Sequence, residues 1–505
     1  MGKDTKSNRY NTRIRQDFQE LHTHAHTFYS QAFPHLSKIH YFCATFYAIM
    51  SQNAPIELGR KPIGRLLLQY ATPAIIAMTA SSLYNNIDRI FIGQCVGPMA
   101  ISGLATTFPF MNLAAAFGAM VGVGASTLIS VRLGQKDYKT ANHVLGNTIT
   151  LNLILGILFT IVCWAFLDPI LYLFGASRQT LPYARDYMEI ILLGNVISHS
   201  YFGLNAVLRA AGHPRLAMRC TIITVILNAI LDPIFIWYLN MGIRGAAIAT
   251  IISQATSLAI ELWLFSRPRE IIHLQHGIYR LNLTIIRQTL AIGLSPFLMN
   301  SCACLVVLFI NRGMRDFGGD YALGAYGIVN SVIFFFLMIV MGLNQGMQPI
   351  VGYNWGARQD DRVWHTLRLT IIGATVITVT GFVIGEFIPE TITHIFTTNE
   401  HITQLASHGF RLCVSVFPLV GAQMVIGNFF QSIGHAGKSI FLSISRQMLF
   451  LIPLLNILPR YMMLDGVWLS IPISDSVSFC FAIGMLLWEI NHIKSKTNAS
   501  AKDQS

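Results

Sequence analysis

The chain has 505 residues, of which 53% are hydrophobic and only 11% are charged, and its mean hydropathy is +0.52. Ordinary soluble chains carry about 25% charged residues, so this chain could not cover a soluble surface with polar groups. The same composition excludes intrinsic disorder of the whole chain, which requires low hydrophobicity. The formal net charge of +12 is divided among short clusters between apolar stretches. That pattern orients membrane helices and does not indicate nucleic-acid binding.

Apolar stretches long enough to cross a bilayer recur along the chain, separated by short connectors rich in Gly, Pro and charge. We predict twelve spans and therefore an all-α polytopic membrane protein. The spans are 65–92, 99–132, 141–167, 183–211, 216–239, 244–265, 284–311, 321–351, 364–388, 402–432, 439–458 and 466–490.

Lys and Arg are distributed unevenly between the two sets of connecting loops. One set carries about twenty of them, including Lys438 and Arg446, and the opposite set carries only five: Arg178, Arg244, Arg312, Arg315 and Arg460. Cytoplasmic loops hold the excess of basic residues in membrane proteins. We therefore expect a multi-pass protein of the inner (cytoplasmic) membrane with both termini in the cytoplasm.

Residues 1–55 form a predicted polar extension that is rich in basic residues and histidine. Its HTHAH run at 22–26 could bind a metal, but a disordered segment explains it better. The apolar run at 39–50 is about half the length of a span. Because the patterned part of the chain starts just after Met50, one hypothesis is that Met50 is the initiator.

The two halves of the chain match each other at an offset of about 222 residues. The matched pairs are GASTLISVRLGQKD (124–137) with GMQPIVGYNWGARQ (346–359), RAAGHPR (209–215) with QSIGHAG (431–437), GAAIATIIS (245–253) with GVWLSIPIS (466–474), and Pro73 with Pro296. Four matches in one order indicate an internal repeat.

Each repeat contains six predicted spans, so both enter the membrane with the same orientation. Parallel repeats imply two six-helix bundles related by a pseudo-twofold axis along the membrane normal, with a cleft between them. We expect an N-lobe at 56–270, a C-lobe at 271–495 and a cytoplasmic tail at 496–505.

Two acidic residues are predicted to lie well inside spans, where a charge is costly and usually functional. Asp88 is in span 1 and Asp232 is in span 5. Asn85 precedes the first by three residues and Asn228 precedes the second by four, so each amide shares a helix face with its carboxylate. Thr250 lies in span 6 within GAAIAT, a run of small residues that permits close helix approach.

These side chains offer only oxygen ligands, which suit a proton or a hard cation such as Na⁺. Pro233 adds to the set, because it removes the usual partner of the Ala229 carbonyl. At the offset of Asp88 the second half has Asn311, and at the offset of Asp232 it has only apolar residues. We therefore expect cation coupling to belong to the N-lobe.

Simpler roles stay open for each of these residues. Asp88 could pair with Arg89, Asp232 could be a hydrated residue of a helix kink, and Thr250 could be a packing residue. Glu189 in span 4 is a further candidate that could lie near the outer water. Glu261 and Glu386 are interpreted as helix-end groups.

In combination, three segments resemble the multidrug and toxic compound extrusion (MATE) family. They are NNIDRIFIG on span 1, LNAILDPIFI on span 5 and GVGASTLISVRLGQ after span 2. The resemblance covers about residues 56–490 and is strongest to the DinF-like branch with its MepA-type members. It implies a cation site in the N-lobe formed by carboxylates on spans 1 and 5, here Asp88 and Asp232, with Asn228 and Thr250 beside them.

The resemblance also implies that span 1 bends near Pro73. The NorM-like branch carries acids in spans 7 and 10, and the corresponding segments 284–311 and 402–432 have none. A C-lobe sodium site is therefore not expected.

The resemblance implies an antiporter in which entry of H⁺ or Na⁺ drives export of amphiphilic, mostly cationic compounds by alternating access. We expect the protein to be a monomer and to need no cofactor. The alternative is a lipid-linked oligosaccharide flippase of the same superfamily, which Arg312 and Arg315 near a helix end keep open. An enzyme is not expected, because the chain has no H-E-x-x-H, D-D-x-x-D or P-loop motif. Candidates for lining the cleft are Thr107, Asn112, Tyr201, Asn205, Asn330, Phe334 and Gln423.

Overall fold

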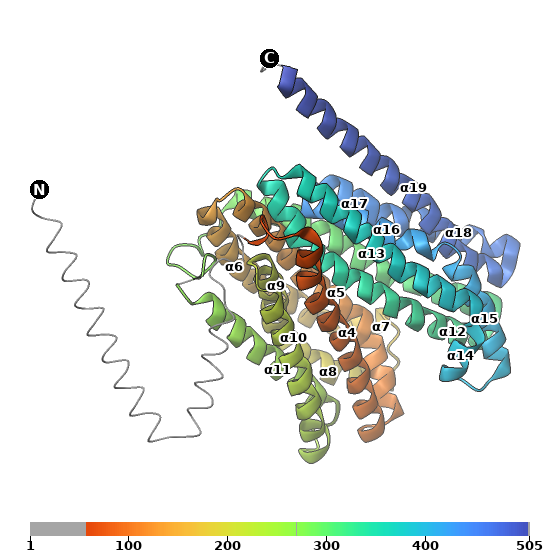
Figure 1. Cartoon of the computed structure of the whole chain (residues 1–505). Coiled ribbons are helices and arrows are strands. Elements are labelled where there is room, and N and C mark those ends of the chain that lie inside the picture. The colour runs from red at the N-terminus through yellow and green to blue at the C-terminus, as the bar shows by residue number, and fades with distance from the viewer. Residues whose placement is uncertain (1–56, 269, 503–505) are drawn as a thin grey trace, which may run out of the picture. The chain divides into compact units, whose positions relative to one another are not determined.

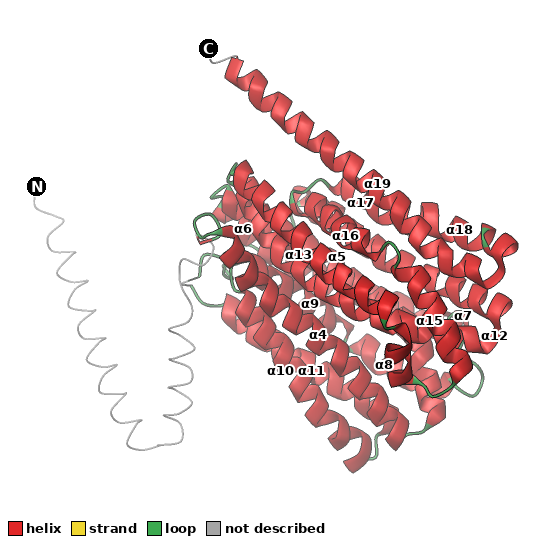
Figure 2. Ribbon diagram, turned by 45° about the vertical axis from the view of Figure 1, so that its right-hand side comes forward, coloured by secondary structure: helices red, strands yellow, loops and turns green. Residues whose placement is uncertain are grey.

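The computed structural model describes residues 57–268 and 270–502, without the side chains of 83–90, 93–95, 98 and 493–502. The predictions for the HTHAH run and for Met50 lie outside this range. The described residues form helices and loops and include no strand (Figure 2).

The first repeat folds into a group of helices that we call the N-bundle. Its elements are α4 (Ile63–Cys95), α5 (Pro98–Gly134), α6 (Tyr138–Ala165), α7 (Leu167–Leu173), α8 (Leu181–Leu193), α9 (Asn195–Ala210), α10 (Pro214–Pro233), the π-helix η1 (Ile234–Tyr238) and α11 (Gly242–Phe265).

The second repeat folds into the C-bundle, which lies beside the N-bundle (Figure 1). Its elements are α12 (Leu283–Gly356), α13 (Asp360–Phe387), α14 (Pro389–Phe396), α15 (Glu400–Val414), α16 (Phe417–Ser432), α17 (Ala436–Ile444), the π-helix η2 (Ser445–Leu451), α18 (Ile452–Ile457) and α19 (Pro459–Lys502).

Among the described residues, 8 helices could cross a membrane by length and composition, or up to 10 if the bent pairs α8–α9 and α15–α16 each count as one span. Two further features complete the predicted twelve. The 74-residue α12 contains two helices joined at Gly319, whose φ of 68° is a left-handed conformation that favours glycine. The 33 residues of α4 are also long enough to cross a bilayer. The prediction of twelve spans in two bundles is therefore confirmed.

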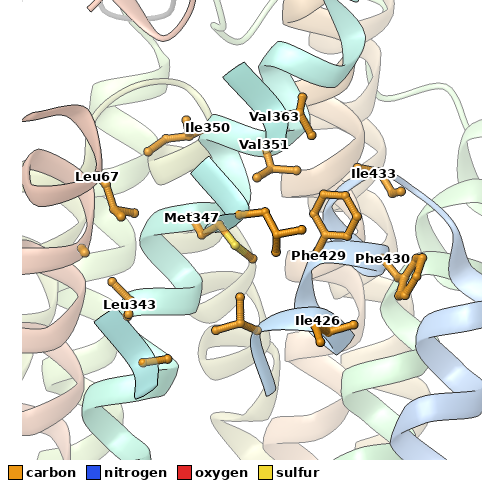
Figure 3. Close-up of a cluster of buried hydrophobic side chains, with 14 of the residues drawn as sticks. Leu67, Leu343, Met347, Ile350, Val351, Val363, Ile426, Phe429, Phe430 and Ile433 are labelled. Carbon is orange, nitrogen blue, oxygen red and sulfur yellow. The ribbon is translucent and has the colours of Figure 1, made fainter. Parts of the chain in front are cut away.

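The first turns of α4 are packed against the C-bundle, although α4 belongs to the first repeat. Leu66, Leu67 and Tyr70 join a buried apolar cluster with Met347 of α12 and Phe429 of α16. Figure 3 shows Leu67 facing this cluster from its own helix. Near its other end α4 contributes Ile92 to a cluster of the N-bundle. One continuous helix therefore connects the two bundles.

The glycines of the first matched pair of segments, Gly124, Gly134, Gly346 and Gly356, lie where the two bundles meet. A Cβ atom on Gly134 would overlap the carbonyl oxygen of Tyr353, and one on Gly356 would overlap that of Val131. A Cβ on Gly124 would likewise overlap the Thr289 carbonyl. These contacts join α5 to α12 beside the basic loops that we assign to the cytoplasmic side. We call this set of contacts the interbundle seam.

Candidate functional site

Asp232 and Asn228 lie one turn apart on α10 and are both fully buried, with 0% of their surface exposed. The Asn228 Nδ2 donates hydrogen bonds to Asp232 Oδ1 at 3.2 Å and to Thr250 Oγ1 at 3.4 Å. Thr250 reaches this position from α11, which the small residues Gly245, Ala246 and Ala249 allow to approach α10. The structure thus brings together three residues that the sequence predicted as one site.

The oxygen atoms of this cluster fit the ligand set of a hard cation. The cluster contains a carboxylate, an amide and a hydroxyl, and the amide nitrogen faces the other two groups. Among the described residues, the buried Asn228 Oδ1 accepts no hydrogen bond. An acceptor oxygen in that state is costly unless something binds it, so Asp232, Asn228 and Thr250 are suitable residues to hold Na⁺ or to exchange a proton.

The helix geometry changes directly after Asp232. α10 ends at Pro233, and the chain continues as the π-helix η1. Proline removes one backbone donor from the helical ladder, and π-helical turns are frequent at functional sites. The predicted disturbance of span 5 at Pro233 takes this form.

Asp88 and Asn85 belong to α4, but their side chains lie outside the described residues. The backbone of α4 packs against α10 and also contacts α11 and η1. The second carboxylate of the predicted site therefore comes from a helix that borders the Asp232 cluster. Pro73 is buried within α4, which remains helical through it.

The seven candidates for the cleft divide into two groups. The side chains of Asn112, Asn330 and Phe334 are exposed. The other four are buried in their bundles, and three of them have described hydrogen-bond partners: Thr107 bonds to Leu104 O, Tyr201 to Thr221, and Asn205 to Glu261. The fourth is Gln423.

Glu189 lies on α8 and forms an ion pair with Arg185, at 2.9 Å between Oε1 and Nε. Arg185 also contacts Asp168, at 3.2 Å. This small network is partly exposed and gives Glu189 a partner on its own helix. It does not extend to the Asp232 cluster in any described contact.

Glu261 corrects one of our expectations. It lies near the end of α11, as predicted, but it is fully buried and not solvated. Asn205 Nδ2 donates a hydrogen bond to Glu261 Oε1 at 2.9 Å, and Arg209 Nη1 donates to Asn205 Oδ1. The Asn205 side chain therefore bridges the Arg209 guanidinium and the buried Glu261 carboxylate.

Asp475 is a second correction, because sequence reasoning found only two acids well inside spans. It lies on α19 and its side chain is 8% exposed. Its Oδ1 forms an ion pair at 2.8 Å with Nε of Arg446, on η2, and Ser474 Oγ donates to Arg446 O. We had assigned Arg446 to a cytoplasmic loop. Arg446 lies several positions inside predicted span 439–458, and Asp475 lies several positions inside predicted span 466–490. Their positions within these spans were visible in the sequence.

A polar contact also crosses the interbundle seam. Gln348 of α12 donates from Nε2 to Ser126 Oγ at 3.1 Å and to Thr127 Oγ1 at 2.7 Å, both on α5. All three residues are buried. The seam therefore combines close backbone packing with specific hydrogen bonds.

The chain matches the MatE family model over residues 73–234 and 291–457. It is 28% identical over 425 residues to the "Multidrug export protein MepA" of Staphylococcus haemolyticus, which covers 84% of this chain and 93% of that protein.

Solved structures of transporters match it as well. The MATE multidrug transporter DinF-BH, solved in complex with the dye rhodamine 6G, is 36% identical, covers 85% of this chain and 96% of that one, and has a TM-score of 0.79. A MATE protein solved in bent and straight conformations is 25% identical and covers 88% of this chain and 99% of that one, with TM-scores of 0.82 and 0.81.

The family-model match spans more than half of the chain in two segments, one in each repeat. That division agrees with the two bundles and with the duplicated glycines of the seam. The chain therefore belongs to the MATE family of multidrug efflux proteins and is a multi-pass membrane transporter.

Proposed function

We propose that the chain is an antiporter that couples entry of H⁺ or Na⁺ to export of amphiphilic, mostly cationic compounds. The buried Asp232–Asn228–Thr250 cluster is the observation that supports this most strongly. A carboxylate buried with an amide and a hydroxyl gives an arriving cation ligands that the lipid does not offer. Asp88, with Asn85 beside it on α4, supplies the second carboxylate in this proposal.

α4 provides a physical route from the cation site to the gate. Its first turns pack on the C-bundle, and its later part borders the Asp232 cluster. Pro73 lies between the two regions, next to Ala71 and Ile75, which contact Gly346 and Gly342 of α12. A bend there costs less than elsewhere in the helix. Cation binding would bend α4 at Pro73 and change its contacts with the C-bundle.

Coupling requires that the cation and the drug stabilise different conformations. The drug would enter a cleft that includes the exposed side chains of Asn112, Asn330 and Phe334, and an aromatic face there would favour a cation. The curated relatives are named as multidrug export proteins, and DinF-BH was solved with a rhodamine dye. These names support an organic cation as the substrate class.

The ion pairs of Arg312 and Arg315 weaken the alternative of a lipid-linked oligosaccharide flippase. It was kept open by Arg312 and Arg315, which could have bound a pyrophosphate headgroup. Arg312 is 80% exposed and pairs with Asp316, and Arg315 pairs with Asp320. Both arginines are thus engaged at an exposed helix end near Gly319.

The basic loops place both termini in the cytoplasm in this proposal, with the protein in the cytoplasmic membrane as a monomer. On that orientation the interbundle seam closes the cytoplasmic side, and the Asp232 cluster lies in the outer half of its span. A cation from outside would then reach the cluster without crossing the seam.

Reconstituted vesicles provide the test. Transport of the rhodamine dye should follow an imposed pH or sodium gradient, and Asp88→Asn should reduce it to the level of empty vesicles. The matched control is Asp186→Asn, an exposed carboxylate paired with Arg244. Varying sodium at fixed pH, and then pH without sodium, identifies the ion. Full gradient-driven transport by Asp88→Asn would refute the coupling role.

A further inference from the structure

The loop that joins the two bundles is held against the N-bundle by two buried asparagines of α6. Asn142 donates to Ile271 O at 3.0 Å and accepts from His273 N at 2.8 Å. Asn147 donates to Arg280 O at 3.1 Å and accepts from Asn282 N at 2.9 Å. The backbone around Arg280 is therefore fixed in place and can form the wall of a binding site.

A cavity of about 810 Å³ lies between this loop, the end of α5, the start of α6 and the first turns of α12. Three basic side chains from three elements line it: Arg132, His143 and Arg280. Thr140, Thr284 and Gln288 add hydroxyl and amide groups. The lining is thus rich in groups that bind the oxygens of an anion.

The two arginines retain donor capacity. In the described part of the chain Arg280 has no acidic partner within ion-pair distance, and the buried Nε of Arg132 donates no hydrogen bond. Arg132 bonds to Gln135 through Nη1 and lies 3.8 Å from Asp137, the nearby carboxylate. Two arginines and one aspartate leave an excess of positive charge at the cavity.

Large apolar side chains border the same site. Leu283 is 78% exposed, and Tyr279 and Leu281 are also exposed. They alternate with Arg280 and Asn282 along one short segment, at the level where α5 ends and α12 begins. With the orientation that the basic loops predict, these helix ends would lie where lipid headgroups meet acyl chains of the cytoplasmic leaflet.

At the C-bundle junction that corresponds by the repeat, the described acceptors engage an arginine. There Arg362 donates to Asn354 Oδ1, Leu58 O and Lys61 O. The segment before α4 thus occupies the guanidinium. The open basic cavity is a feature of the N-bundle side.

We propose that this cavity binds the headgroup of an anionic phospholipid of the cytoplasmic leaflet. The phosphate oxygens contact Arg132 and Arg280, and the acyl chains lie along Leu281 and Leu283. A free phosphate ion would make the same contacts with Arg132 and Arg280, but it has no acyl chains to contact Leu281 and Leu283. Basic pockets between spanning helices on the cytoplasmic side are suited to this ligand. Since the walls come from both bundles, the bound lipid holds them together.

Native mass spectrometry of the full-length protein, with added phosphatidylglycerol or phosphatidylcholine, tests the proposal. Phosphatidylglycerol should bind more tightly, and Arg280→Gln and Arg132→Gln should each weaken it about fivefold. The matched control is Arg215→Gln, an exposed basic residue at the start of α10 outside the cavity. It should bind like the parent.

Two results would overturn the proposal. One is equal binding of the two lipids, or unchanged binding by both cavity variants. The other is displacement of the lipid by inorganic phosphate at comparable concentrations, which would identify a simple anion site. Arg280 is exposed on a loop, so its substitution should leave the melting temperature in detergent unchanged. A loss of lipid binding by this variant would then not be due to unfolding.

Discussion

Asp232 in the N-bundle and Asp475 in the C-bundle are both buried aspartates inside spans, but their described neighbours differ. Asp232 accepts a hydrogen bond from the amide of Asn228, which also bonds to the hydroxyl of Thr250. Asp475 is paired with the guanidinium of Arg446 at 2.8 Å. Burial alone therefore does not distinguish a coupling residue from a structural one.

The nature of the neighbour decides what each carboxylate can do. A guanidinium is a permanent cation that satisfies a buried carboxylate and competes with any arriving ion. An amide and a hydroxyl are neutral and can turn their oxygens toward a bound cation. On this reasoning we expect the C-bundle pair to maintain structure, and we propose that the N-bundle cluster senses the ion. Asp475 adds a buried acid to the C-bundle, and the assignment of cation coupling to the N-bundle stays a prediction.

Breaking the C-bundle pair on one side should have the largest effect on stability. Arg446→Met leaves Asp475 buried without its partner, and we expect a loss of about 3 kcal/mol. The double variant Arg446→Met with Asp475→Leu should recover most of that loss, because it leaves no charge behind. Thermal unfolding in detergent measures both. A double variant as unstable as the single one would show that the pair does more than neutralise a charge.

The seam, unlike the acids, is nearly symmetric, so its two repeated glycines should respond alike. Gly134→Ala and Gly356→Ala each place a Cβ against a carbonyl of the other bundle. Such overpacking costs about 1–3 kcal/mol in the closed state and should favour opening toward the cytoplasm.

Labelling of Gln348→Cys in inside-out vesicles, in a cysteine-free background, reports that opening. Labelling should accelerate in both glycine variants. Gly427→Ala is the control, since nothing lies within 4 Å of its added Cβ. Equal labelling of all three would mean that the seam does not control access.

Gln348→Ala should have a smaller effect of the same kind. It removes hydrogen bonds to Ser126 and Thr127, and each contributes about 1 kcal/mol net. The variant should transport the rhodamine dye with a weakened preference for the closed cytoplasmic state, visible as a lower melting temperature. A melting temperature equal to that of the parent would assign the seam's strength to backbone packing alone.

The smallest expected effect lies at the start of α6, next to the seam. Asp137 caps this helix by accepting from Thr140 N at 3.1 Å. Hydrogen bonding from the Thr140 side chain, and to a smaller extent from its backbone N–H, lowers the pKa of Asp137 below its usual value. The cap is therefore fully present at neutral pH and is lost only as the pH falls through that lowered pKa.

Asp137→Ala should cost about 1 kcal/mol, and Asp137→Asn should cost little, because both Asp and Asn are good caps. Melting temperatures of the two variants at neutral and acidic pH provide the check. The stability difference between the parent and Asp137→Ala should shrink in acid. A difference that stays constant would contradict the capping role.

The architecture could be predicted because hydropathy and the repeat are local signals. Most span boundaries emerged to within a few residues, although the last helix continues to Lys502, beyond the predicted end at 490, and the break at Gly319 falls between predicted spans 7 and 8. Asp232, Asn228 and Thr250 were also predictable, since two share a helix face and the third lies in a run of small residues. Their mutual hydrogen bonds follow from those two local facts.

The missed features depend on contacts between distant segments. Arg446 was interpreted as a loop residue, although it lies inside a span and needs Asp475, 29 positions later, to be stable there. The repeated glycines were visible, but their role at the seam depends on how the two bundles meet. Glu261 was predicted at a helix end, and only the packing of α9 against α11 explains why it is buried.

The affinity of purified protein for the rhodamine dye, measured by fluorescence anisotropy across pH and sodium concentration, tests the central claim most directly. The parent and the Arg446→Met/Asp475→Leu variant should both bind the dye more weakly as the coupling cation is added. Asp232→Asn should bind the dye with an affinity that no longer depends on that cation. If Asp232→Asn keeps the parent's cation dependence while the C-bundle variant loses it, the coupling site lies in the other bundle.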